Sequence, residues 1–316
     1  MKFLFISPRF SGGIGGHAAM LADQLTQHGH DVTKMDISHI PIKNLKNPSF
    51  ALLGSLKCIM NREKYDIVHG FNVPSALPMH YSKGTKKVLS IHGVFSEQIK
   101  KLHSSTISSI ASITESRVLK WADKLTTDSK SSQLQYKKKL NLDFEYLPSA
   151  IDTEKLASIS DIETIPNQVI YLGRDSHEKG IDILRDAEKS IFGKVVYCTN
   201  MPWEKAMKLL KSSSILAAPS RMESLPTNIK EAFYLKIPVV ATNVGGIPEL
   251  VSHNKTGILI SPENPNALSD AINNLLEDSE LIKKITLEAH EFVINEMSWE
   301  KILPKYIKFY DDLLNS

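Results

Sequence analysis

The chain has 316 residues, of which 42% are hydrophobic and 23% charged, an ordinary composition for a globular protein of about two domains. Its two cysteines, Cys58 and Cys198, lie far apart in the sequence, which argues against a disulfide framework or a zinc site and for a reducing compartment. The opening residues MKFLFISPRF indicate a strand rather than a signal peptide, and no apolar run reaches the length of a bilayer span. We therefore expect a cytoplasmic protein.

Charge is distributed unevenly along the chain. Residues 1–150 carry 20 Lys and Arg against 11 Asp and Glu, a net charge of +9, whereas the remainder carries a net charge of −6. A basic half is most simply a solvated surface. It also motivates the hypothesis of peripheral contact with an anionic membrane, on its inner face, or with a phosphate-bearing partner. We expect no nucleic-acid partner.

The first half alternates short apolar runs with helical patterns. A strand over 2–7 is followed by a loop to Gly16 and a helix over 17–28, with apolar residues at helical spacing and Gly29 after it. Further strands are predicted over 31–37, 65–69, 87–92, 124–128 and 145–148, with a loop and short helix over 72–80 and a helix over 107–119. Strands that alternate with helices predict a parallel sheet.

The second half restarts this pattern after a connection over 146–156, where Asp152 or Thr153 is expected to cap a helix. Strands are predicted over 169–173, 194–198, 215–218 and 238–241, and helices over 180–187, 201–212, 266–276, 280–296 and 298–314. The fold class is therefore α/β with two parallel-sheet domains, over 1–150 and 151–297.

A glycine cluster, Ser11-Gly12-Gly13-Ile14-Gly15-Gly16, precedes the first helix. Such a loop lets backbone N–H groups approach an anion at a helix N-terminus. Gly13-x-Gly15-x-x-Ala18, with Asp36 further on, approximates a dinucleotide fingerprint and makes an NAD-dependent oxidoreductase the alternative. Against it, a dinucleotide turn follows its strand almost at once, whereas four residues, 8–11, intervene here.

Two cations follow the strand at 169–173, in the sequence Gly173-Arg174-Asp175-Ser176-His177-Glu178-Lys179-Gly180. Arg174 ends the strand and Lys179 opens a helix. A cation pair at the carboxyl edge of a sheet suits a diphosphate, with Arg as a fork of donors and Lys as a point charge. Ordinary surface charge is the alternative for an isolated pair.

The stretch from Leu216 to Val251 carries two carboxylates, Glu223 and Glu231, eight residues apart. The first lies in a loop and the second on the helix that follows, expected to begin near Pro226. Strands flank both sides, so the acids occupy a strand–loop–helix junction, where open α/β sheets bind ligands. A solvated helix face is the alternative for Glu231.

The second half resembles the donor-binding core of the retaining glycosyltransferases of family 4, which have the GT-B fold. The resemblance rests on the G-R-x4-K-G segment at 173–180 and on the pairs Pro219-Ser220, Glu223-Ser224, Glu231-Ala232, Gly245-Gly246, Pro248-Glu249 and Thr256-Gly257. It implies two Rossmann-like domains facing each other across a cleft, an acceptor-binding one and a nucleotide-sugar-binding one. It also implies that the terminal helix, 298–316, crosses back onto the first domain.

The resemblance assigns roles to individual residues. Arg174 and Lys179 contact the donor phosphates, Glu223 lies near the donor sugar, and Glu231 accepts bonds from the ribose hydroxyls. His92, at the end of a strand, lies near the transferred sugar, and His17 is a weaker candidate for the acceptor. The remaining donor-binding candidates are Gly12, Gly13, Asn200, Met201, Ser224, Leu225 and Thr227. Asn200 and Met201 line the base by default, because the 46 residues from Gly173 to Pro219 leave room for about one βα unit fewer than in the family.

The implied reaction is transfer from a nucleotide-diphosphate sugar, such as a UDP- or GDP-sugar, to a hydroxyl of a glycan or lipid-linked acceptor. No Asp-x-Asp motif occurs, so we expect no metal, with Arg174 and Lys179 taking its role. A nucleotide-sugar-binding protein without catalytic activity is a further alternative.

Overall fold

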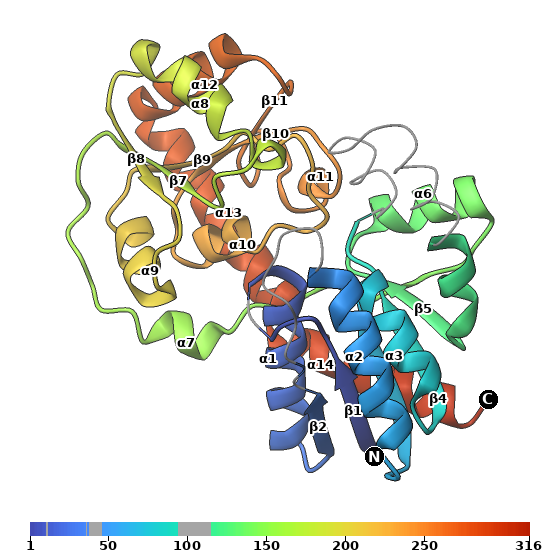
Figure 1. Ribbon diagram of the computed structural model, residues 1–316. Coiled ribbons are helices and arrows are strands. Elements are labelled where there is room, and N and C mark those ends of the chain that lie inside the picture. The colour runs from blue at the N-terminus through green and yellow to red at the C-terminus, as the bar shows by residue number, and fades with distance from the viewer. Residues whose placement is uncertain (11, 36, 38–45, 94–114) are drawn as a thin grey trace. The chain divides into compact units, whose positions relative to one another are not determined.

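The computed structural model describes residues 1–10, 12–35, 37, 46–93 and 115–316, which divide into two compact units. One unit comprises Met1–Ser149 and Ile302–Ser316, and the other comprises Ala150–Lys301. Each unit is built on a parallel sheet of its own (Figure 1). The predicted α/β class with two parallel sheets is confirmed.

In the first unit the described residues form a six-stranded sheet in the order β2-β1-β3-β4-β5-β6. The strands are β1 (Lys2–Ile6), β2 (Asp31–Met35), β3 (Tyr65–Phe71), β4 (Gly84–Ser90), β5 (Lys124–Thr127) and β6 (Glu145–Tyr146). The helices are α1 (Gly13–Gln27), α2 (Lys46–Met60), α3 (Ala76–Tyr81), α6 (Lys130–Leu140) and α14 (Trp299–Leu314), with short 3-10 turns at Val73–Ser75 and Leu119–Trp121. Strand order reverses between β1 and β3.

The second unit holds a five-stranded sheet in the order β11-β10-β9-β7-β8. The strands are β7 (Gln168–Leu172), β8 (Lys194–Cys198), β9 (Ile215–Ala218), β10 (Val239–Thr242) and β11 (Ile258–Ile260). The helices are α7 (Thr153–Ala157), α8 (Ile181–Ala187), α9 (Trp203–Lys211), α10 (Thr227–Tyr234), α11 (Ile247–Leu250), α12 (Pro265–Glu277) and α13 (Ser279–Met297), with 3-10 turns at His177–Lys179 and Glu188–Ser190. Order reverses here between β7 and β9.

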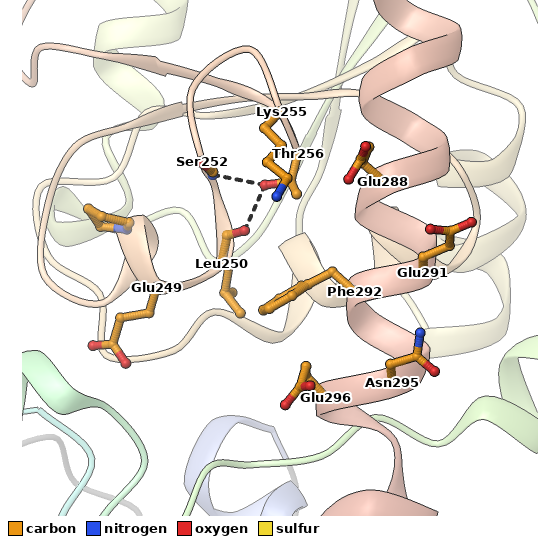
Figure 2. A pocket seen from close by; sticks show the side chains of 11 residues that line it. Glu249, Leu250, Ser252, Lys255, Thr256, Glu288, Glu291, Phe292, Asn295 and Glu296 are labelled. Atoms are coloured by element: carbon orange, nitrogen blue, oxygen red, sulfur yellow. Dashed lines mark hydrogen bonds between the residues drawn. The ribbon is translucent and has the colours of Figure 1, made fainter.

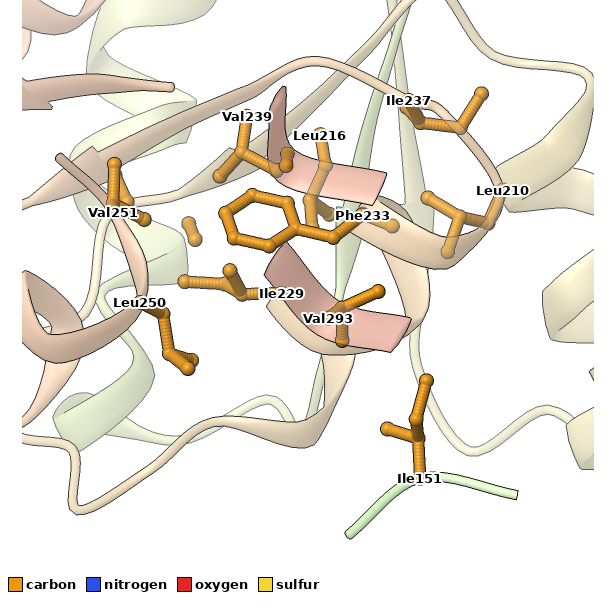
Figure 3. Close-up of a cluster of buried hydrophobic side chains, with 14 of the residues drawn as sticks. Ile151, Leu210, Leu216, Ile229, Phe233, Ile237, Val239, Leu250, Val251 and Val293 are labelled. Carbon is orange, nitrogen blue, oxygen red and sulfur yellow. The ribbon is translucent and has the colours of Figure 1, made fainter. Parts of the chain in front are cut away.

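Alternation along the strands of the second unit builds a core on each face of its sheet. Ile170 and Leu216 point to the side covered by α9, α10 and α13, whereas Val169 and Ile215 point to the side covered by α8 and α12. Figure 3 shows Phe233 of α10 among the side chains of the first of these cores. Burying each such side chain contributes about 1.5–3 kcal/mol, which fixes α10 against the sheet.

The last helix belongs mainly to the first unit. An extended residue, Ser298, separates α13 from α14, and from Ile302 onward the chain groups with Met1–Ser149. Tyr310 is fully buried there, where its hydroxyl lies 2.8 Å from Nδ1 of His69.

Most predicted elements are found within a few residues of their expected limits, and Asp152 caps α7 by accepting from the Lys155 N–H at 2.9 Å. Helices α2, α6 and α11 and the strand β11 were not predicted. Most of the predicted helix at 107–119 lies outside the described residues; within its described part, residues 115–118 are helical. Asp36 also lies outside the described residues. Among the residues that are described, no helix combines the length and apolarity that crossing a bilayer requires.

Candidate active site

The strongest candidate site lies where strand order reverses in the second unit. From β7 the chain leads into α8 on one face, and from β9 it leads into α10 on the other. The loops after these neighbouring strands, 173–180 and 219–226, therefore diverge from one sheet edge. In open α/β sheets this carboxyl edge at the switch point is where ligands bind.

Close backbone contacts hold the two loops together. Gly180 has a left-handed backbone, with φ +64°, and a Cβ there would lie 2.0 Å from the Pro219 carbonyl oxygen. The Arg221 N–H donates to the Glu178 carbonyl at 2.8 Å. The Asn228 side-chain amide donates to the Leu172 carbonyl at 2.7 Å, which joins the first turn of α10 to the end of β7. These contacts give the predicted donor loops a fixed mutual geometry.

Lys179 and Glu223, 44 residues apart, meet across this junction. Lys179 Nζ lies 2.5 Å from Glu223 Oε1, and the Ser220 hydroxyl donates to the same oxygen at 2.9 Å. The two side chains are 20% and 11% exposed, so solvent screens the pair poorly and removing one side chain would leave the other poorly compensated. Sequence reasoning placed both residues in the site, and the structure brings them into contact.

The Gly245-Gly246 turn packs against the backbone of Glu223. The Gly246 N–H donates to the Glu223 carbonyl at 3.2 Å. Gly245 has φ +54°, and a Cβ there would lie 1.9 Å from that carbonyl oxygen. A backbone oxygen cannot yield as a flexible side chain would, so the Gly245-Gly246 pair is a steric requirement of the site.

Arg174 lies on the same loop as Lys179, but its side chain has a different partner. Its guanidinium bonds to Glu178 at 3.0 Å, and the side chain is 64% exposed. An exposed pair of this kind is weak, so Arg174 can exchange Glu178 for an anionic ligand at little cost.

Glu231, on α10, contacts the start of α9 rather than Glu223. The indole N–H of Trp203 donates to Glu231 Oε1 at 2.8 Å, and Lys155 Nζ lies 4.3 Å from the centre of the Trp203 ring. Burial raises the pKa of the Glu231 carboxyl to about 7, opposed in part by the bond from Trp203 and by the charges of Lys230 and Lys155. Glu231, the residue predicted to bind the ribose, therefore titrates near neutral pH.

The other predicted donor residues are distributed around this edge. Leu225 is 4% exposed, so its side chain belongs to the core, while Thr227 opens α10, where backbone N–H groups lack helical partners. Ser224 lies between the two carboxylates in sequence, on the second of the joined loops, 219–226. Asn200, with φ +54°, and Met201, 40% exposed, lie between β8 and α9.

In the first unit, His92 and Asp128 meet at the corresponding sheet edge. They lie two residues beyond Ser90 and Thr126, which are paired in the parallel register of β4 and β5. His92 Nδ1 is 3.1 Å from Asp128 Oδ2, and the side chains are 13% and 4% exposed. The aspartate therefore fixes the orientation of the imidazole.

His17 lies inside α1 and does not cap it. The residue is 3% exposed, its Nε2 is 2.9 Å from the Tyr306 hydroxyl of α14, and its ring centre is 5.5 Å from that of His92. This burial leaves little side-chain surface at His17, and its role toward an acceptor stays a prediction. Gly12 is the N-cap of α1 and Gly13 its first residue, and both have positive φ. Six residues separate Ile6, the end of β1, from Gly13, which is longer than a dinucleotide turn allows.

A pocket of about 420 Å³ in the second unit lies elsewhere. Glu249, Glu288, Glu291 and Glu296 line it, as Figure 2 shows. Four carboxylates would repel a diphosphate. None of the predicted donor-binding residues, all of which are described, lines this pocket.

Comparison with solved structures identifies the fold. The chain is similar in structure to sucrose-phosphate synthase from Thermosynechococcus elongatus, with a TM-score of 0.84 at 17% identity over 99% of both chains. The Anabaena HepE protein in complex with UDP-glucose matches with a TM-score of 0.75 at 17% identity, covering 99% of this chain and 100% of that one. The chain has the GT-B fold.

Comparison with sequence families and with related sequences identifies the family of the chain. The family described as "Glycosyltransferase Family 4" matches residues 36–155, and "Glycosyl transferases group 1" matches 185–292. An uncharacterized glycosyltransferase of Methanocaldococcus jannaschii is 23% identical over 96% of this chain and 95% of its own length. The N-acetyl-alpha-D-glucosaminyl L-malate synthase of Bacillus anthracis is 32% identical over 35% of this chain and 29% of its own. The chain belongs to the family 4 glycosyltransferases.

Sequence reasoning missed two contributors to the site. Asp128 directly follows β5, and His92 lies just beyond the end of the neighbouring strand β4. Their position at the same carboxyl edge of the sheet could have indicated from the sequence that they lie close together. The contact of Trp203 with Glu231 joins residues 28 apart in the sequence. Only the prediction that Asn200 and Met201 line the base pointed toward this segment.

Proposed function

We propose that the chain is a retaining glycosyltransferase that moves a sugar from a nucleotide-diphosphate sugar to a hydroxyl of a glycan or lipid-linked acceptor. The observation that carries the proposal is the Lys179–Glu223 pair at the switch point of the second sheet, beside the loop of Arg174. A cation there would face the diphosphate, and a carboxylate beside it would face the sugar. The Anabaena neighbour holds UDP-glucose, which supports this donor class.

Each charged group would then have a defined task. Lys179 and Arg174 would neutralise the leaving diphosphate, whose charge grows in the transition state. Glu231 would accept the ribose hydroxyls in place of the Trp203 indole. We propose that the cation pair removes the need for a divalent metal.

The proposed chemistry is a same-face substitution. The bond between the anomeric carbon and the phosphate oxygen breaks, the acceptor oxygen bonds to that carbon from the same side, and the acceptor proton passes to the leaving phosphate. An oxocarbenium-like transition state fits this route, whereas a double displacement would need a carboxylate nucleophile beneath the anomeric carbon. His92, oriented by Asp128, is the catalytic candidate of the first unit.

The basic first half is proposed to meet an anionic membrane at its cytoplasmic face, which would suit a lipid-linked acceptor. Attraction of this kind depends on ionic strength.

The test is a panel of nucleotide sugars incubated with the protein, with release of free nucleotide as the readout. We expect slow release from one or a few donors, its loss in Lys179→Ala, and retention of anomeric configuration in the product by NMR. NADH binding without nucleotide-sugar binding would replace the proposal by an oxidoreductase. Tight donor binding with no release and no transfer to any acceptor would indicate a binding protein.

A further inference from the structure

Helix α2 presents an apolar row outward from the first unit. Leu52, Leu53, Leu56, Ile59 and Met60 are between 42% and 80% exposed. Their spacing places them on one continuous face of the helix. Single exposed apolar residues are normal, but five on one helix face form a patch of the kind that marks an interaction site.

The opposite face of α2 is already committed to the core. Phe50 and Cys58 are at most 1% exposed, and Gly54 allows a close approach, since a Cβ there would lie 2.7 Å from Ile37 and 2.8 Å from Pro78. The outward row therefore cannot turn inward without losing this packing. A helix that is apolar on both faces is normally covered on both.

The charges that flank the row indicate what covers it. Between residues 46 and 64 the sequence carries four cations, Lys46, Lys57, Arg62 and Lys64, and one carboxylate, Glu63. Glu63 is already bound by Lys2 at 2.6 Å. Cations thus lie toward both ends of the row, and no uncompensated acid lies between them.

We propose that this face of α2 docks on the surface of a bilayer that contains anionic lipid. Leucine, isoleucine and methionine side chains would enter the boundary between headgroups and acyl chains, while the flanking lysines and arginine meet lipid phosphates. A helix of 15 residues is about 22 Å long, enough to lie along the interface but not to cross it. This inference rests on the membrane contact proposed above, and it names the surface that would make that contact.

A second copy of the chain fits this face less well. A symmetric dimer apposes the same patch from two chains. Because both ends of the row are cationic, parallel and antiparallel pairing would each bring like charges together, which opposes association.

The experiment is vesicle flotation of the full chain, with phosphatidylcholine vesicles and with vesicles that also contain phosphatidylglycerol. The variant combines Leu56→Ser and Ile59→Ser. Both side chains are more than half exposed, so the fold should persist, as circular dichroism will verify. The matched control is Leu134→Ser, which removes a 69% exposed leucine on α6 of the same unit.

We expect the unsubstituted chain to float with the anionic vesicles and to be released by salt. The double variant should lose roughly tenfold or more in membrane partitioning, as expected for withdrawing two apolar side chains from the interface, and the control should float normally. Absence of flotation at low salt, or an equal loss in the control, would overturn the proposal. So would a dimer that the double substitution dissociates without any effect of vesicles.

Nucleotide release from the donor, measured without vesicles, separates this inference from the proposed reaction. It should be unchanged in the double variant. Failure of flotation with release intact removes only the α2 surface, whereas failure of release in the unsubstituted chain removes the transferase proposal.

Discussion

Glu231 gives the most quantitative prediction, because burial raises its pKa to about 7. A ribose hydroxyl donates its proton, so the carboxylate must be ionised to accept two such bonds. With this pKa, about one-eleventh of the chains carry an ionised Glu231 at pH 6 and about ten-elevenths at pH 8. If the donor binds only the ionised form, its apparent Kd falls about tenfold between these values.

The assay is calorimetric titration of the protein, from pH 6 to pH 8, with the donor that the nucleotide-release panel identifies. The diphosphate diester of a nucleotide sugar does not itself titrate in this range. The dependence of the Kd on pH therefore reports the ionisation of a protein group. Glu231→Gln should bind more weakly at pH 8 and show a flat profile. Trp203→Phe removes the bond that opposes the raised pKa, so its profile should move to higher pH. A pH-independent Kd in the unsubstituted chain, or a sloping profile retained in Glu231→Gln, would refute the assignment.

The same pKa has a consequence for stability without donor. A raised carboxyl pKa means that the folded state holds a proton that the unfolded state releases. The contribution of this group is therefore fully present below its unfolded pKa of about 4.5 and is lost as pH rises through about 7. The full shift corresponds to about 3 kcal/mol as an upper limit. Relative to the unsubstituted chain, Glu231→Gln should gain stability as pH rises from 5 to 8, measured by urea unfolding.

Three further predictions concern the first of the joined loops and the glycine turn that contacts Glu223. Arg174→Ala should lower turnover roughly tenfold while costing less than about 1 kcal/mol of stability, and Arg185→Ala, which breaks another exposed pair, should leave turnover unchanged; equal turnover in both variants would remove the phosphate role. Lys179→Ala should lower turnover roughly 100-fold and, by leaving its carboxylate partner poorly compensated, cost about 1–3 kcal/mol in urea unfolding; full activity would contradict its role. Gly245→Ala should destabilise by more than about 3 kcal/mol, because its Cβ would overlap a backbone oxygen, whereas Gly29→Ala, at φ +82° with open space around it, should cost about 1 kcal/mol; comparable melting temperatures for the two variants would be the contrary result.

The sheets could be predicted from the sequence because buried parallel strands are continuous apolar runs. Ile215–Ala218 and Val239–Thr242 are fully buried, and no other element suits such short runs between turn residues. Knowing the strands then placed Arg174, Lys179 and Glu223 at one edge, which the structure confirms for Lys179 and Glu223.

Helices α2 and α6 escaped prediction for opposite physical reasons. In α2, apolar residues occupy both faces, so the sequence shows no amphipathic contrast from which a helix can be recognised. In α6 the segment KSSQLQYKKKL is almost entirely polar, and only the contacts of Tyr136 and Ser132 bury it. Its helical state is decided by the Ser129 cap and by tertiary packing rather than by periodicity.

The environment of the site residues could not be predicted, because it depends on contacts between segments distant in sequence. The raised pKa of Glu231 arises from burial beside Trp203, and the burial of His17 arises from Tyr306, 289 residues away. Residue type and spacing identified which groups are present at the edge. Their partners follow only from how the helices pack.

The most direct measurement of the central claim is a crystal structure of the chain with its intact nucleotide-sugar donor. The account predicts the diphosphate within hydrogen-bonding distance of Lys179 Nζ and the ribose hydroxyls on the Glu231 carboxylate, with the Trp203 bond broken. A donor whose phosphates lie against the Gly12-Gly13 turn alone, or in the pocket lined by Glu288 and Glu291, would contradict it.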